Sequence, residues 1–115
     1  MNFKYFTLDE FKCQETGEHG IKEEFVTALD ALRDECGFPF RITSGYRSPS
    51  HSIEAKKKRP GQHAMGIACD IAVNGGNQRI IIVENALKLG FSGIGVSKTF
   101  IHVDIRTTSK MMWCY

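Results

Sequence analysis

An aspartate in the middle of an alternating apolar segment constrains the fold of this chain more than any other feature. In residues 66–73 larger apolar residues such as Ile71 occupy every second position, and Asp70 belongs to the opposite set. Alternation with a period of two predicts a strand with one face in a core. The neighbours of Asp70 on its own face are Ala68 and Ala72, which leave open space beside a charge that is costly to bury alone. We therefore expect a positively charged group beside Asp70.

A second alternating segment, residues 100–105, carries polar groups that could face Asp70. Its aliphatic residues fall at every second position, so His102 and Asp104 share the other face. The members of that face are Phe100, His102, Asp104 and Arg106. We expect them to form one wall of a site.

The rest of the chain predicts two main helices and a small sheet. Apolar residues recur at three- and four-residue steps in residues 21–36 and in residues 78–89, where Ile81, Val83 and Leu87 carry the pattern. The other predicted elements are a capped helical turn at residues 7–11, strands at 40–43 and 91–96, and a solvated loop or helix end at the basic residues 56–59. This irregular order favours a single α+β domain over residues 1–115 with a small antiparallel or mixed sheet.

Composition excludes several classes of protein. The chain is 42% apolar and 24% charged, with a net charge of +2, so it can bury a core and has no dedicated nucleic-acid surface. No run approaches the roughly 18 apolar residues of a membrane span, and residues 1–11 lack a secretory signal. The four cysteines show no C-x-x-C spacing, which predicts buried reduced thiols.

Three residues are candidate metal ligands: His63, Asp70 and His102. Two imidazoles and one carboxylate, with a fourth position open for water, are a catalytic zinc arrangement. Taken singly, a strand aspartate usually pairs with an arginine and a histidine is usually a partly buried polar residue. The other two histidines, His19 and His51, are interpreted as surface or loop residues, His51 being a weak candidate for lining a cleft.

Three motifs occur in a defined order. They are Ser44-Gly45-Tyr46-Arg47-Ser48-Pro49, Gln62-His63-x-x-Gly66-x-Ala68-x-Asp70 and Phe100-Ile101-His102-Val103-Asp104. This order resembles the zinc-dependent D-alanyl-D-alanine carboxypeptidases and the related phage L-alanyl-D-glutamate endopeptidases, over about residues 6–106. The resemblance implies a zinc cofactor held by His63, Asp70 and His102.

The resemblance also implies roles in substrate binding and catalysis. Arg47 is expected to contact the substrate or stabilise the developing oxyanion, and Ser44, Tyr46 and Gln62 are expected to bind substrate beside it. Several family members place an acidic general base three residues before the second histidine ligand, where this chain has Thr99. Asp104 shares a face with His102 and is an alternative base; equally, it could orient His102 and leave the proton to another group.

These expectations favour a zinc peptidase acting on peptide bonds of bacterial peptidoglycan. The size of the chain and the absence of a signal resemble a phage endolysin, made in the host cytoplasm and released to the cell wall by a separate protein. We expect a monomer that binds a peptidoglycan peptide and neither nucleic acid nor membrane. A non-catalytic zinc-binding domain, structural or signalling, is the alternative, and the bond cut stays open among D-Ala-D-Ala, L-Ala-D-Glu and cross-links.

Overall fold

The computed structural model describes residues 3–115 and centres on a five-stranded mixed sheet. The strand order is β1-β2-β4-β3-β5, with antiparallel pairing throughout except between β3 and β5, which are parallel. The strands are β1 (Ile42–Ser44), β2 (Ala68–Ala72), β3 (Gly93–Val96), β4 (Phe100–Asp104) and β5 (Met111–Cys114). This architecture confirms the predicted α+β class.

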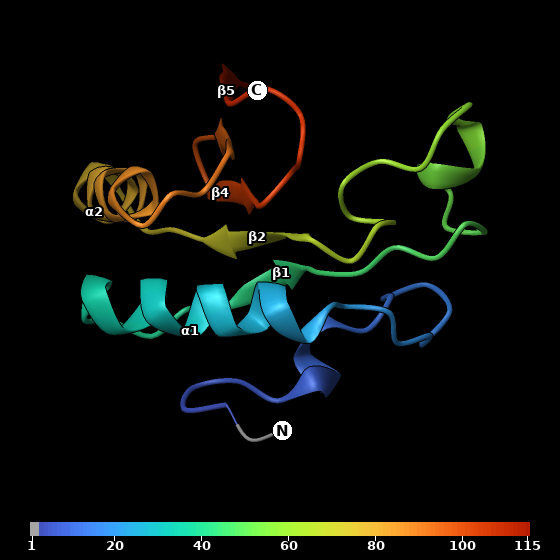
Figure 1. The fold of residues 1–115 in the computed structure, drawn as a ribbon, viewed down its shortest axis with the longest axis horizontal. Helices are drawn as coiled ribbons and strands as arrows, with labels where there is room; N and C mark the ends of the chain where they lie inside the picture. Colours follow the sequence, from blue (N-terminus) through green and yellow to red (C-terminus); the bar gives the residue numbers. More distant parts are fainter. Residues whose placement is uncertain (1–2) are drawn as a thin grey trace.

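Two helices, α1 (Glu23–Cys36) and α2 (Gly76–Lys88), pack on one side of the sheet (Figure 1). α1 buries Phe25 and Leu29 against sheet residues such as Ile71, and it ends where Gly37 takes a left-handed φ of 77°. A short 3₁₀ helix, η1 (Leu8–Phe11), adds Phe11 to the same core. Within the described residues, no helix has both the length and the apolar character of a membrane span.

The two faces of the sheet have opposite chemistry. In β2 and β4 the side chains of Cys69, Ile71 and Val103 point into the core beneath the helices. Asp70 and His102 belong to the alternate set and leave the core, as the sequence alternation predicts. The face away from the helices is therefore the face on which the site is built.

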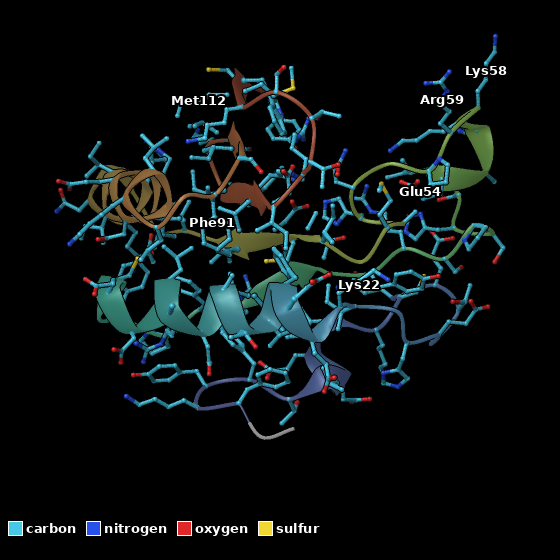
Figure 2. All side chains as sticks on the ribbon, viewed as in Figure 1. Lys22, Glu54, Lys58, Arg59, Phe91 and Met112 are labelled. Atoms are coloured by element: carbon cyan, nitrogen blue, oxygen red, sulfur yellow. The ribbon has the colours of Figure 1, made fainter. Side chains whose placement is uncertain are left out.

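A long excursion of residues 45–67 joins β1 to β2 and lies beside the sheet (Figure 1). It contains a second 3₁₀ helix, η2 (Glu54–Lys56), and the basic run. Lys58 extends away from the body of the molecule in Figure 2, as expected of a solvated residue. Glu54 instead is buried and accepts hydrogen bonds from Lys57 Nζ and the Gly61 backbone N–H. This segment is thus more than a solvated loop.

The structure differs from the sequence expectation in several places. The first strand begins at Ile42 rather than residue 40, because Phe40 packs into the core instead of pairing. The final strand β5 was not predicted, since four residues after a polar stretch carry little periodic signal. The prediction of buried thiols holds for Cys13 and Cys69, but Cys114 in β5 is exposed.

The buried face of α2 also differs from the predicted one. Ile82 and Ala86 are fully buried, whereas the side chain of Leu87 is 54% exposed. Residues 80–83 are all aliphatic, so the sequence does not distinguish which of them faces the sheet. Packing against β3 and β4 selects Ile82.

We predict that Ile82→Ala lowers the free energy of unfolding by about 2–5 kcal/mol, because it leaves a cavity in the core. The matched control Leu87→Ala removes an exposed side chain and should cost less than about 1 kcal/mol. Urea denaturation followed by circular dichroism measures both changes. A larger loss in Leu87→Ala than in Ile82→Ala would contradict this assignment of the helix face.

Candidate metal centre

The three predicted ligands meet on the open face of the sheet. Asp70 in β2 lies directly opposite His102 in β4, and His63 reaches them from the end of the excursion. Asp70 Oδ1 is 3.4 Å from His63 Nε2 and 3.3 Å from His102 Nδ1. One donor atom from each of the three residues lies within 4.8 Å of the others, and all three residues are buried. The structure therefore brings the three predicted ligands together.

The remaining ring nitrogens of both histidines are already hydrogen-bonded. His63 Nδ1 donates to the Gly45 carbonyl at 2.7 Å, and His102 Nε2 donates to Asp104 Oδ2 at 2.6 Å. These acceptors fix each tautomer so that the nitrogen facing Asp70 carries a lone pair. Both imidazoles are thus held in the form that binds a metal.

Two atoms of the group lack hydrogen-bond partners among the described residues. Asp70 Oδ1 and His102 Nδ1 are buried and unsatisfied, a costly arrangement for a carboxylate oxygen and an imidazole nitrogen. A cation between them would satisfy both atoms and neutralise the buried charge. Two imidazole nitrogens and a carboxylate oxygen are suitable donors for zinc, so the residues fit the predicted cofactor.

The electrostatics of the site keep its carboxylates ionised. Burial alone would raise the pKa of Asp70, but the nearby imidazoles of His102 and His63 outweigh it and hold this pKa well below its usual range. Burial likewise opposes ionisation of Asp104, and bonds from Arg106 and His102 lower its pKa more strongly. Burial lowers the pKa of His102, yet Asp104 and Asp70 raise it above the ordinary value. Both carboxylates beside the imidazoles are therefore ionised.

A glycine in the Ser44-Gly45-Tyr46-Arg47 motif places the acceptor for His63. A Cβ at Gly45 would lie 2.7 Å from the backbone of Phe11, so a side chain there would push the loop off η1. The next residue, Tyr46, secures the same approach by donating its backbone N–H to the Phe11 carbonyl at 2.7 Å. This close packing explains why the motif needs glycine beside the metal ligand.

Arg47 lies next to the centre without forming a hydrogen-bonded ion pair. Its Nη2 is 3.8 Å from Asp70 Oδ2 and its Nη1 is 3.9 Å from Glu54 Oε2. The Arg47 side chain is only 16% exposed, and its buried Nε has no hydrogen-bond partner among the described residues. The guanidinium is held by two carboxylates and keeps donors free for another group.

A cavity of about 480 Å³ opens above the three ligands. Of the predicted substrate-binding residues, Arg47 and Gln62 line it, and Gln62 Oε1 has no partner among the described residues. Ser44 and Tyr46 are absent from its lining: Ser44 pairs with Asp70 in the sheet, and the Tyr46 ring packs against Gly20. His51 is also outside the lining and faces Glu15.

Several residues of the cavity were not predicted as site residues. Lys57, Trp113 and Tyr115 line it. Glu54 is outside the lining and lies 3.9 Å from the Arg47 guanidinium. Trp113 is the one tryptophan of the sequence, but its position depends on the strand β5, which the sequence did not reveal. For Lys57, membership of a basic run concealed the contact with buried Glu54.

Asp104 lies behind the metal ligands. It is fully buried, absent from the cavity lining, and accepts hydrogen bonds from His102 Nε2 at 2.6 Å and Arg106 Nη2 at 2.6 Å. Arg106 Nε donates to the same carboxylate at 2.9 Å. Of the two predicted roles for Asp104, this geometry favours orienting His102 over accepting a proton from water.

A mixed sheet that holds a buried His-Asp-His group beside an open cavity defines a metalloenzyme centre. The chain matches the family model described as Peptidase M15 over residues 4–104. It therefore belongs to the M15 peptidases, a family of zinc-dependent metallopeptidases. A search of curated proteins finds no match.

We predict that the chain binds one zinc ion and that His63→Ala, Asp70→Ala and His102→Ala each weaken binding at least about tenfold, because two remaining ligands define the site poorly. Metal analysis after equilibrium dialysis gives stoichiometry and affinity. His19→Ala, which removes an exposed histidine, is the matched control and should bind zinc like the parent. Full zinc affinity in all three ligand variants would refute the assignment.

Proposed function

We propose that this protein is a zinc peptidase that hydrolyses peptide bonds in bacterial peptidoglycan, acting as a phage endolysin. The observation that carries the proposal is a pair of buried atoms without hydrogen-bond partners, Asp70 Oδ1 and His102 Nδ1, at the base of an open cavity in an M15 peptidase. The motif order found in the sequence supports the peptidoglycan substrate.

The residues of the cavity divide the work of peptide hydrolysis. Zinc held by His63, Asp70 and His102 would supply a Lewis acid and an acidified water. Arg47 lies beside Asp70 with free donors and would bind the carbonyl oxygen as it gains charge, or a substrate carboxylate. Gln62 offers an unpaired amide oxygen that can accept a peptide N–H.

Asp104 serves in this proposal as a positioning residue. Its bond to His102 Nε2 keeps the lone pair of Nδ1 directed at the centre, and Arg106 holds the carboxylate in place. Such an acceptor also increases the basicity of the metal-binding nitrogen. Asp104 is thus expected to act on metal affinity first and on the chemical step only through it.

The second candidate is a zinc-binding domain without catalysis. Among the described residues, Asp70 is the one carboxylate that lines the cavity, and Thr99 occupies the place of the acid found in several family members. This composition leaves no separate carboxylate in the lining to accept a proton from water. This feature supports the non-catalytic zinc-binding domain, and the following experiment distinguishes it from the peptidase.

We expect the purified protein to reduce the turbidity of outer-membrane-permeabilised bacteria, and expect a zinc chelator to abolish the effect until zinc is restored. His102→Ala is the inactive control. Mass spectrometry of the released muropeptides identifies the bond cut. Zinc binding without any new peptide end in these products would reject the peptidase and support the non-catalytic domain.

We predict that Asp104→Asn weakens zinc binding about 10- to 100-fold and that activity falls in parallel, because the amide supports His102 less well than the carboxylate. Saturating zinc should then restore most of the turnover. Asp9→Asn, at an exposed position, is the matched control. A loss of about 100-fold in turnover at full zinc occupancy would instead identify Asp104 as the general base.

A further inference from the structure

We infer that Trp113 and Tyr115, together with Phe100, form an aromatic wall of the cavity that binds the apolar part of the peptide next to the scissile bond. This inference rests on the proposed peptidase function and deepens it. The two C-terminal aromatic residues lie beyond residues 4–104, the part of the chain that the family model matches. Their place in the site therefore comes from the structure.

The three rings form a continuous surface beside the metal ligands. Ring centres of Phe100 and Tyr115 are 4.9 Å apart, and those of Trp113 and Tyr115 are 6.3 Å apart. The Trp113 ring lies 4.9 Å from the imidazole of His102. All three aromatic residues line the cavity. A substrate held at the centre would therefore contact this wall.

The sheet register places Trp113 beside His102. Gly95 in β3 pairs with His102 on one side and with Trp113 on the other, so the two rings meet above it. A Cβ at Gly95 would lie 2.6 Å from Trp113 Nε1, so glycine is needed for the indole to occupy this place. The Arg106 guanidinium lies 5.0 Å from the Trp113 ring centre and holds the indole from another side. Trp113 is therefore preorganised rather than loosely exposed.

The other groups of the cavity have different chemistry. Arg47, Lys57 and Gln62 come from the excursion and bring positive charge and an amide. The aromatic residues come from β4, from β5 and from the residue that follows β5. Fixed aromatic rings bind apolar groups at a low cost in conformational entropy. The cavity thus offers an aromatic side to an apolar group of the peptide and a positively charged side to a carboxylate.

Steady-state hydrolysis of purified muropeptides tests the wall. Trp113→Ala and Tyr115→Ala should each raise KM at least about fivefold, with kcat and zinc content changed less than about twofold, because they remove ground-state contacts and no ligand. Trp113→Phe should recover part of the lost affinity. Met112→Ala alters the same strand on its opposite face and is the matched control, expected to behave as the parent.

The outcomes separate this inference from the function on which it rests. Unchanged KM in both Trp113→Ala and Tyr115→Ala, with an active parent, would overturn the wall and leave the peptidase intact. If circular dichroism shows that Trp113→Ala does not fold, Tyr115→Ala alone tests the wall, because Tyr115 is exposed and its loss should not disturb folding. If the parent itself is inactive, the proposed function has failed, and the fluorescence of Trp113, the one tryptophan of the sequence, tests the wall instead. A saturable change in fluorescence when muropeptides are added to the zinc-loaded protein supports the wall, and no change overturns it.

Discussion

The charge on Asp70 sits in the middle of a sheet, only 7% exposed, and much of the surrounding structure compensates for it. A buried carboxylate is tolerated only with charged or hydrogen-bonding partners. Here a guanidinium lies beside it, and two imidazoles complete a group that can hold a cation. They come from three different parts of the chain: the start of the excursion, its end, and β4. Because the buried carboxylate of Asp70 needs such neighbours, the three motifs that are separate in the sequence meet around it.

The ligands are in turn supported by groups that have no side-chain chemistry of their own. The Gly45 carbonyl holds His63, and the missing side chain at Gly93 makes room for the Asp104 carboxylate, which a Cβ there would overlap. Gly95 does the same for Trp113. The centre is therefore built as much from backbone and empty space as from functional groups, as expected of a preorganised site.

The metal centre could be predicted because alternation within single strands is visible in the sequence. The position of β5 and the buried face of α2 could not, because they depend on packing between distant parts of the chain. Alternation in the strands that became β2 and β4 was enough to place Asp70 and His102 on one face, and motif order added His63 and Arg47. Trp113 was missed because β5 pairs in parallel with β3, a contact that no local pattern encodes. The face of α2 was misjudged because a run of aliphatic residues satisfies several helical faces equally.

The alternation of β2 also decides which metals the centre can accept. Cys69 is adjacent to Asp70 in sequence, but its thiol points into the core, where burial raises its pKa well above the usual value and keeps it protonated. A slip of one residue against β4 would exchange the two side chains and place a soft thiolate donor beside His102. Ile71 and Ile101, directly paired and fully buried, oppose that slip. The packing of two isoleucines thus keeps the donor set to nitrogen and oxygen and disfavours soft ions such as copper(I).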